Sequence, residues 1–209
     1  MPDTPSPSAI LPLSVLEAIR NLDTPVEDGL EGLADEMVSR RLGLSATVAA
    51  QITRYKEAVS RRGTVSPDEV VSVLRLVSRR PDAALAFADA GRRAARYAIR
   101  GGAGSQQTVL TVSPGPIRSR LARRAVRRLL RDYFQGELVP KTEIPELRMP
   151  APLSIAAVPD GAACGFYGAA FGELLRMLTG FEGATVHELC RGRGDSACIW
   201  RAHRAGGYE

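Results

Sequence analysis

All three cysteines of the chain lie in its last quarter, together with one of its only two histidines. They fall within the 35 residues from Cys164 to Cys198 and, with His187 and Cys190, form the pattern C-x22-H-x2-C-x7-C. Three thiolates and one imidazole are a complete tetrahedral ligand set for a structural zinc ion. Buried cysteines also occur as small hydrophobic residues. Because only 3 of 209 residues are cysteine, their convergence on one region favours a metal site.

The residues between these candidate ligands predict a β-hairpin preceded by a helix. A β-type run covers 185–190, and the turn at 191–195 (RGRGD) reverses the chain, so that Cys198 returns beside Cys190 on a paired strand. Cys164 opens the preceding helix. Neighbouring side chains of a strand point to opposite faces, so His187 is favoured over Glu188 as the fourth ligand. Zinc with four protein ligands would be structural, since no position is left for water or substrate.

Two stretches of this region resemble the 4-vinyl reductase domain family. They are CGFYGAAFGELL at 164–175 and VHELCRGRGDSAC at 186–198. In that family a helix begins near a cysteine, an acidic-x-x-Cys strand and a Gly-Asp turn follow, and aromatic-sensing relatives hold zinc through three Cys and one Glu. Here His187 stands where those relatives have the Glu, a departure that keeps a zinc ligand and makes the site one unit less negative. The resemblance covers about 150–202.

The resemblance implies an α+β fold with N-terminal helices packed on a small antiparallel sheet, as in the TRAPP and haem-NO-binding superfamily. In such domains an apolar cavity commonly holds a hydrophobic or aromatic ligand, and the helix from 165 to 178 borders it. Phe166, Tyr167 and Phe171 are therefore candidate ligand-binding residues, and tight helix–sheet packing is the alternative for each. The segment 88–97 (ADAGRRAARY) and the basic helix after it also resemble the bacteriochlorophyll-pathway member of the family, which implies a tetrapyrrole ligand.

The basic character of the chain is concentrated in one predicted helix. Residues 117–134 hold seven arginines and one acid, Asp132, a net +6 against +5 for the whole chain. The helix has one apolar face, predicted to be Ile117, Leu121, Ala125, Leu129 and Tyr133. Its basic face is either solvated or meets nucleic acid phosphates, an anionic membrane or the carboxylates of a tetrapyrrole. Nucleic acid is disfavoured because interleaved aromatics are lacking; the candidate anion-binding residues are Arg124, Arg127 and Arg128.

The positions of prolines and glycines divide the chain into a disordered arm at 1–10, a helical region at 11–100 and a 4-vinyl reductase-type domain at 101–209, which ends in the zinc-bound hairpin. The arm lacks a basic start and does not resemble a signal peptide. No run approaches the roughly 20 apolar residues of a membrane span, so a cytoplasmic protein is expected. Capping residues and apolar periodicity predict helices over 11–22, 25–42, 45–61, 66–77 and 81–99. In the last of these, Leu85, Ala88, Arg92 and Ala95 are predicted to stack along one face. The sequence also predicts an extended piece at 108–112, an exposed excursion or frayed hairpin at 136–152, and a strand at 153–158.

These features favour a zinc-stabilised protein that binds a hydrophobic, tetrapyrrole-type ligand and serves bacteriochlorophyll biosynthesis as a carrier or accessory factor for pathway enzymes. One alternative is a small-molecule sensor acting on a transcriptional partner. Another is a true 4-vinyl reductase with an external electron donor. Catalysis is disfavoured because the sequence has no dinucleotide-binding fingerprint after a strand and no cysteines beyond the zinc set for an iron–sulfur cluster. Small-residue surfaces permit a homodimer.

Overall fold

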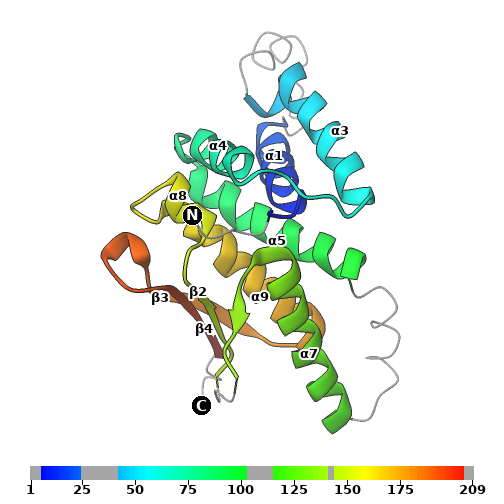
Figure 1. Cartoon of the computed structure of the whole chain (residues 1–209), viewed down its shortest axis with the longest axis vertical. Helices are drawn as coiled ribbons and strands as arrows, with labels where there is room; N and C mark the ends of the chain where they lie inside the picture. Colours follow the sequence, from blue (N-terminus) through cyan, green and yellow to red (C-terminus); the bar gives the residue numbers. More distant parts are fainter. Residues whose placement is uncertain (1–5, 25–41, 103–114, 141–143, 205–209) are drawn as a thin grey trace, which may run out of the picture.

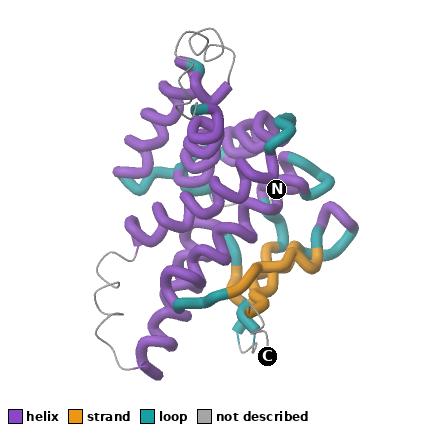
Figure 2. The backbone as a smooth tube through the Cα atoms, turned by 180° about the vertical axis from the view of Figure 1, so that it is seen from behind, coloured by secondary structure: helices purple, strands orange, loops and turns teal. Residues whose placement is uncertain are grey.

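A computed structural model of the chain describes residues 6–24, 42–102, 115–140 and 144–204 (Figure 1). Within these residues the protein is α+β, with seven α-helices and a four-stranded antiparallel open sheet packed against them, as expected. The strands gather on one flank of the helical body (Figure 2). The elements are α1 Ile10–Asp23, η1 Leu42–Leu44, α3 Ala46–Ser60, α4 Pro67–Ser78, α5 Ala83–Gly102, α7 Gly115–Phe134, β1 Glu137–Leu138, β2 Glu146–Met149, α8 Leu153–Ala157, η2 Ala162–Cys164, α9 Gly165–Thr179, β3 Gly183–Leu189, η3 Arg191–Arg193 and β4 Cys198–Arg204.

Local capping explains where several helices begin and end. The hydroxyl of Ser45 accepts from the N–H of Val48 at the start of α3, and the hydroxyl of Ser66 does the same for Glu69 at the start of α4. Gly180 ends α9 in the left-handed conformation that favours glycine. The predicted starts at 45 and 66 are therefore confirmed. The helix predicted over 25–42 and the extended piece at 108–112 lie almost wholly outside the described residues.

The end of the predicted arm belongs to the folded helical region. Ser8 forms a bridge with Thr64, and the N–H of Ala9, which is fully buried, donates to the carbonyl of Gly63. Helix α1 then begins at Ile10. The prediction of a disordered arm was wrong for these residues, because the proline- and serine-rich composition did not reveal a partner that lies more than fifty residues away.

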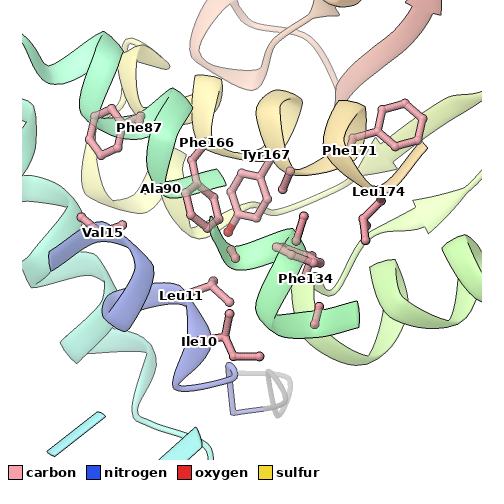
Figure 3. Close-up of a cluster of buried hydrophobic side chains, with 14 of the residues drawn as sticks. Ile10, Leu11, Val15, Phe87, Ala90, Phe134, Phe166, Tyr167, Phe171 and Leu174 are labelled. Atoms are coloured by element: carbon pink, nitrogen blue, oxygen red, sulfur yellow. The ribbon is translucent and has the colours of Figure 1, made fainter. Parts of the chain in front are cut away.

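Helix α9 lies between α5 and the sheet, and the largest core cluster surrounds it (Figures 1 and 3). Phe166 packs against Phe134 of α7 and Tyr167, with ring centroids 6.4 and 5.2 Å apart. Helix α5 approaches α9 at Gly91, where an added Cβ would lie 2.2 Å from the carbonyl oxygen of Phe166. Only glycine permits this backbone approach.

The sheet has the strand order β1-β2-β4-β3, with every pair antiparallel. Its inner face carries Leu147, Met149 and Trp200, all at least 98% buried, with Leu147 opposite Trp200. The hairpin alternative for 136–152 is therefore confirmed, but the segment is not an exposed excursion. Its second strand is central because it pairs with β4, about fifty residues later in the chain.

Three predictions of detail were wrong. Residues 153–157 form the helix α8 rather than a strand. Five residues are too few to show whether apolar residues recur with a helical or a strand period. Pro152, in an extended conformation, is the residue that precedes the helix. The stripe predicted on α5 fails at Leu85, which is 65% exposed, and at Arg92. On α7, Ile117 is 53% exposed, while Val126 and Leu130 are fully buried beside the predicted Ala125 and Leu129. Both helices are so rich in arginine and alanine that their sequences allow the buried face to be placed at more than one rotation about the helix axis.

Replacing Gly91 by alanine tests the α5–α9 crossing. We expect the free energy of unfolding to fall by about 2 kcal/mol, because the new methyl group meets backbone that cannot give way. The matched control is Gly172→Ala, where the Cβ would meet Thr185 at an ordinary 3.4 Å, and where we expect no loss and a gain of up to about 1 kcal/mol in helix propensity. Urea unfolding measures both; equal effects would contradict the proposed close approach.

Candidate metal centre

The four predicted ligands come from three elements of the fold and lie together. Cys164 precedes the first residue of α9, His187 lies on β3, Cys190 follows that strand and Cys198 begins β4. Their candidate ligand atoms all lie within 4.8 Å of one another. For comparison, four sulfur atoms at about 2.3 Å around one zinc ion are about 3.8 Å apart. The group is therefore consistent with a structural metal such as zinc.

A β-bulge brings His187 and Cys190 to the same side of their strand. In a regular strand residues three apart point to opposite faces. Here the register of β3 on β4 shifts between His187 and Leu189, and an extra residue, Glu188, is inserted. The bulge re-aims the chain so that His187 and Cys190 both reach the cluster. Glu188 points away, forms an ion pair with Arg201 and lies 3.3 Å from Nε2 of His203. The preference for His187 therefore agrees with the structure, but the reason for it is the bulge, since regular alternation would have placed Glu188 on the side of Cys190.

The turn between Cys190 and Cys198 is held by hydrogen bonds to its own ends. The carbonyl oxygen of Cys190 accepts from the N–H of Arg193 at 2.8 Å and from that of Asp195 at 3.3 Å. The carboxylate of Asp195 accepts from the N–H of Cys190 at 2.7 Å. The N–H of Arg191 donates to Sγ of Cys198 at 3.4 Å. A sulfur that accepts such a bond is better able to carry negative charge, as a thiolate ligand must.

Two glycines allow neighbouring backbone to close over the cluster. Gly161 has φ +83°, and an added Cβ would lie 2.7 Å from Sγ of Cys190 and 3.7 Å from Sγ of Cys164. Gly192 packs on the same turn, where its Cβ would lie 2.4 Å from the carbonyl oxygen of Pro159. Sequence reasoning did not assign Gly161 to the site. Its signal was a turn glycine three residues before a ligand cysteine.

His187 is prepared to act as a neutral ligand. Its ring stacks on Trp200 with centroids 4.4 Å apart and planes within 8°. Burial, and then the positive charge of Arg193, lower the pKa of His187 below its ordinary 6.5, so the ring is neutral at pH 7. Among the described residues, its buried Nε2 has no hydrogen-bond partner. A buried polar atom without a partner is costly, and a metal ion would remove that cost.

The burial of Cys164 and Cys198 opposes ionisation of their thiols. Cys164 and Cys198 are fully buried and Cys190 is 3% exposed. Burial raises the pKa of Cys164 far above its usual range, although the hydroxyl of Ser154, 3.1 Å from its Sγ, acts in the opposite direction. Burial also raises the pKa of Cys198. A bound divalent metal displaces these protons and stabilises the thiolates.

Two arginines of the turn lie beside the cluster with their side chains fixed. Nη1 of Arg191 donates to the carbonyl oxygen of Pro150 at 2.7 Å, and Nη2 of Arg193 donates to that of Glu188 at 2.6 Å. Zinc with three thiolates and one imidazole carries a net charge of −1. The positive charge of Arg193 lowers the pKa of His187, so the guanidinium of Arg193 acts on this site.

The predicted ligand-binding residues do not form one site. Phe166, Tyr167 and Phe171 are at least 98% buried and pack among core side chains (Figure 3). Arg124, Arg127 and Arg128 are exposed on α7. The structure thus places the aromatic residues in helix packing, which was the alternative given for each, and places the arginines where an anion can reach them.

Comparison of the chain with protein-family models, with curated proteins and with solved structures finds no match. Over the described residues, no helix combines the length and the apolar character needed to cross a membrane.

The two histidines provide a matched test of the metal site. We expect purified protein to hold one zinc ion per chain, and His187→Gln to bind zinc more than about 100-fold more weakly, because losing even an outer partner of a ligand costs about 10- to 100-fold. His203→Gln is the control, since His203 lies on the outer face of the sheet beside Glu188. Competition with a chelating dye measures both affinities. Equal zinc binding by the two variants would remove His187 from the ligand set.

Proposed function

We propose that Cys164, His187, Cys190 and Cys198 hold a structural zinc ion that fastens the last hairpin to the start of α9. The observation that carries this proposal is the buried cluster of three thiols and one imidazole. Sulfur-rich tetrahedral sets are typical of zinc. Because four protein ligands complete the coordination, the ion would stabilise the fold and leave no open position for a reactant.

We propose further that the chain is a protein of the 4-vinyl reductase type. The support is the order of features around the cluster. Helix α9 begins after Cys164, Cys190 follows strand β3, and the Gly194–Asp195 pair ends the turn before Cys198. These are the features on which the sequence resemblance depends. A sheet covered on one face by helices is also what a TRAPP or haem-NO-binding-like fold would require.

The proposed activity is binding of a hydrophobic, anionic ligand of the tetrapyrrole type, as a carrier or accessory factor in bacteriochlorophyll biosynthesis. Helix α7 supports the anionic part of this proposal. Its arginines at 118, 120, 123, 124, 127, 128 and 131 are all exposed, and its one acid, Asp132, is paired with Arg128 and Arg131. Guanidinium groups bind carboxylates through two parallel hydrogen bonds, which suits the acidic side chains of a tetrapyrrole.

Titration of the zinc-loaded protein with mesoporphyrin IX, a porphyrin with two propionates, tests this function by absorption and fluorescence. We expect a saturable complex. Replacing Arg124, Arg127 and Arg128 together by glutamine should weaken it by about tenfold or more, at about 1 kcal/mol per exposed charge pair, while zinc content and helicity stay unchanged. Wild-type protein that does not bind the porphyrin would contradict the proposed ligand class. Unchanged affinity in the triple variant would make the arginines a solvated surface only.

A further inference from the structure

A cleft of about 410 Å³ lies where three segments distant in sequence converge. Arg62 contributes from the turn between α3 and α4, Gly102 from the end of α5, and Arg128, Leu129, Asp132 and Tyr133 from α7. This volume lies within the range of pockets that hold small organic molecules. Of the arginines predicted to bind an anion, Arg128 is the one that lines this cleft.

The glycines that end α5 allow α7 to approach the end of that helix closely beside the cleft. A Cβ added to Gly102 would lie 2.7 Å from Cδ2 of Leu129 and 3.2 Å from Cε2 of Tyr133. A Cβ on Gly101 would lie 2.9 Å from the hydroxyl of Tyr133. Because neither residue has a side chain, Leu129 and Tyr133 pack directly against the end of α5. Both line the cleft, Tyr133 as a half-buried ring and Leu129 with only 2% of its surface exposed.

Arg62 occupies an unusual backbone conformation at the cleft. Its φ is 54°, in the left-handed region that favours glycine, although Gly63 is the next residue. Its N–H donates to the carbonyl oxygen of Val59 at 3.0 Å and closes the end of α3. The N–H of Gly63 also donates to the carbonyl oxygen of Ala58 at 2.7 Å, so this conformation is a left-handed cap of α3. The cap brings Arg62, which is exposed, into the lining of the cleft.

The charges that line the cleft sum to +1. Arg62 and Arg128 are positive, and Asp132 is negative. Nε of Arg131 contacts Asp132 Oδ1 at 2.8 Å, whereas Nε of Arg128 is 3.5 Å from Oδ2. Asp132 is thus paired more closely with Arg131, outside the lining, than with Arg128. With Asp132 engaged by Arg131, the lining presents two positive groups, Arg62 and Arg128, to a carboxylate on a ligand.

We infer that this cleft binds the carboxylate of a small amphipathic organic acid. Arg62 and Arg128 pair with the carboxylate from two sides, and Leu129 and Tyr133 contact the apolar part. The inference rests on the proposed function only for the identity of the natural ligand, to which it would give a place for one acidic group. The binding chemistry of the cleft stands on its own residues.

The probe is 1-pyrenebutyrate, a fluorescent aromatic carboxylate, compared with its uncharged amide by fluorescence anisotropy on the full-length protein. We expect the acid to bind, the amide to bind at least about tenfold more weakly, and Arg62→Gln and Arg128→Gln each to raise Kd about fivefold to tenfold. Arg120→Gln is the matched control, since Arg120 is exposed on α7 but does not line the cleft. Asp132→Asn should lower Kd about twofold to fivefold, a gain that misfolding cannot imitate.

Several outcomes would overturn the inference. Equal binding of acid and amide would leave no role for the arginines, and equal weakening by Arg120→Gln would show diffuse attraction to the whole helix. If inorganic phosphate displaced the probe at a concentration equal to that of the probe, charge alone would explain binding. The proposed contact of Leu129 and Tyr133 with the apolar part would then be excluded. Mesoporphyrin IX separates the two proposals: if it binds equally to wild type, R62Q and R128Q while pyrenebutyrate does not bind, the cleft inference fails and the proposed function stands. If pyrenebutyrate behaves as expected but the porphyrin does not bind, the inference is supported and the proposed ligand is wrong.

Discussion

The position of α9 depends on close backbone contacts on two of its sides. On one side, Gly91 of α5 brings that helix against the carbonyl of Phe166. On the other, a Cβ on Gly168 would lie 2.9 Å from Cδ1 of Trp200, so the sheet also approaches the helix backbone. Interiors packed this closely leave little freedom to shift. The first turn of α9, and with it Cys164, is therefore held at a fixed place relative to β4.

The candidate metal centre lies where this packing alone gives little support. Strand β3 is at the edge of the sheet, and none of its seven residues is fully buried. Burial of apolar surface therefore contributes little to holding β3 and the turn that follows. A metal bound by Cys164 from the helical side and by His187, Cys190 and Cys198 from the hairpin would supply a strong link at this point. The bulge at Glu188, the bond from Arg191 to Cys198 and the close backbone approach at Gly161 all serve the same cluster.

The sequence predicted the clustering of three cysteines and one histidine and most of the described helices, but not the packing that unites them. Residue type and spacing were sufficient for Cys164, His187, Cys190 and Cys198 because thiols and imidazoles are scarce in this chain. Ser45 and Ser66 were readable because a helix cap is a local hydrogen bond. The central position of β2 depends on pairing with a strand about fifty residues away, which no local pattern reveals. The bulge at Glu188 and the cleft at Arg62 likewise arise only when distant segments meet.

X-ray absorption at the zinc edge of the purified protein tests the central claim most directly. The Cys3His assignment predicts one zinc per chain with three sulfur neighbours at about 2.3 Å and one nitrogen neighbour at about 2.0 Å. A first shell rich in oxygen, with two or fewer sulfurs, or a protein that acquires no zinc when the metal is supplied, would contradict the account.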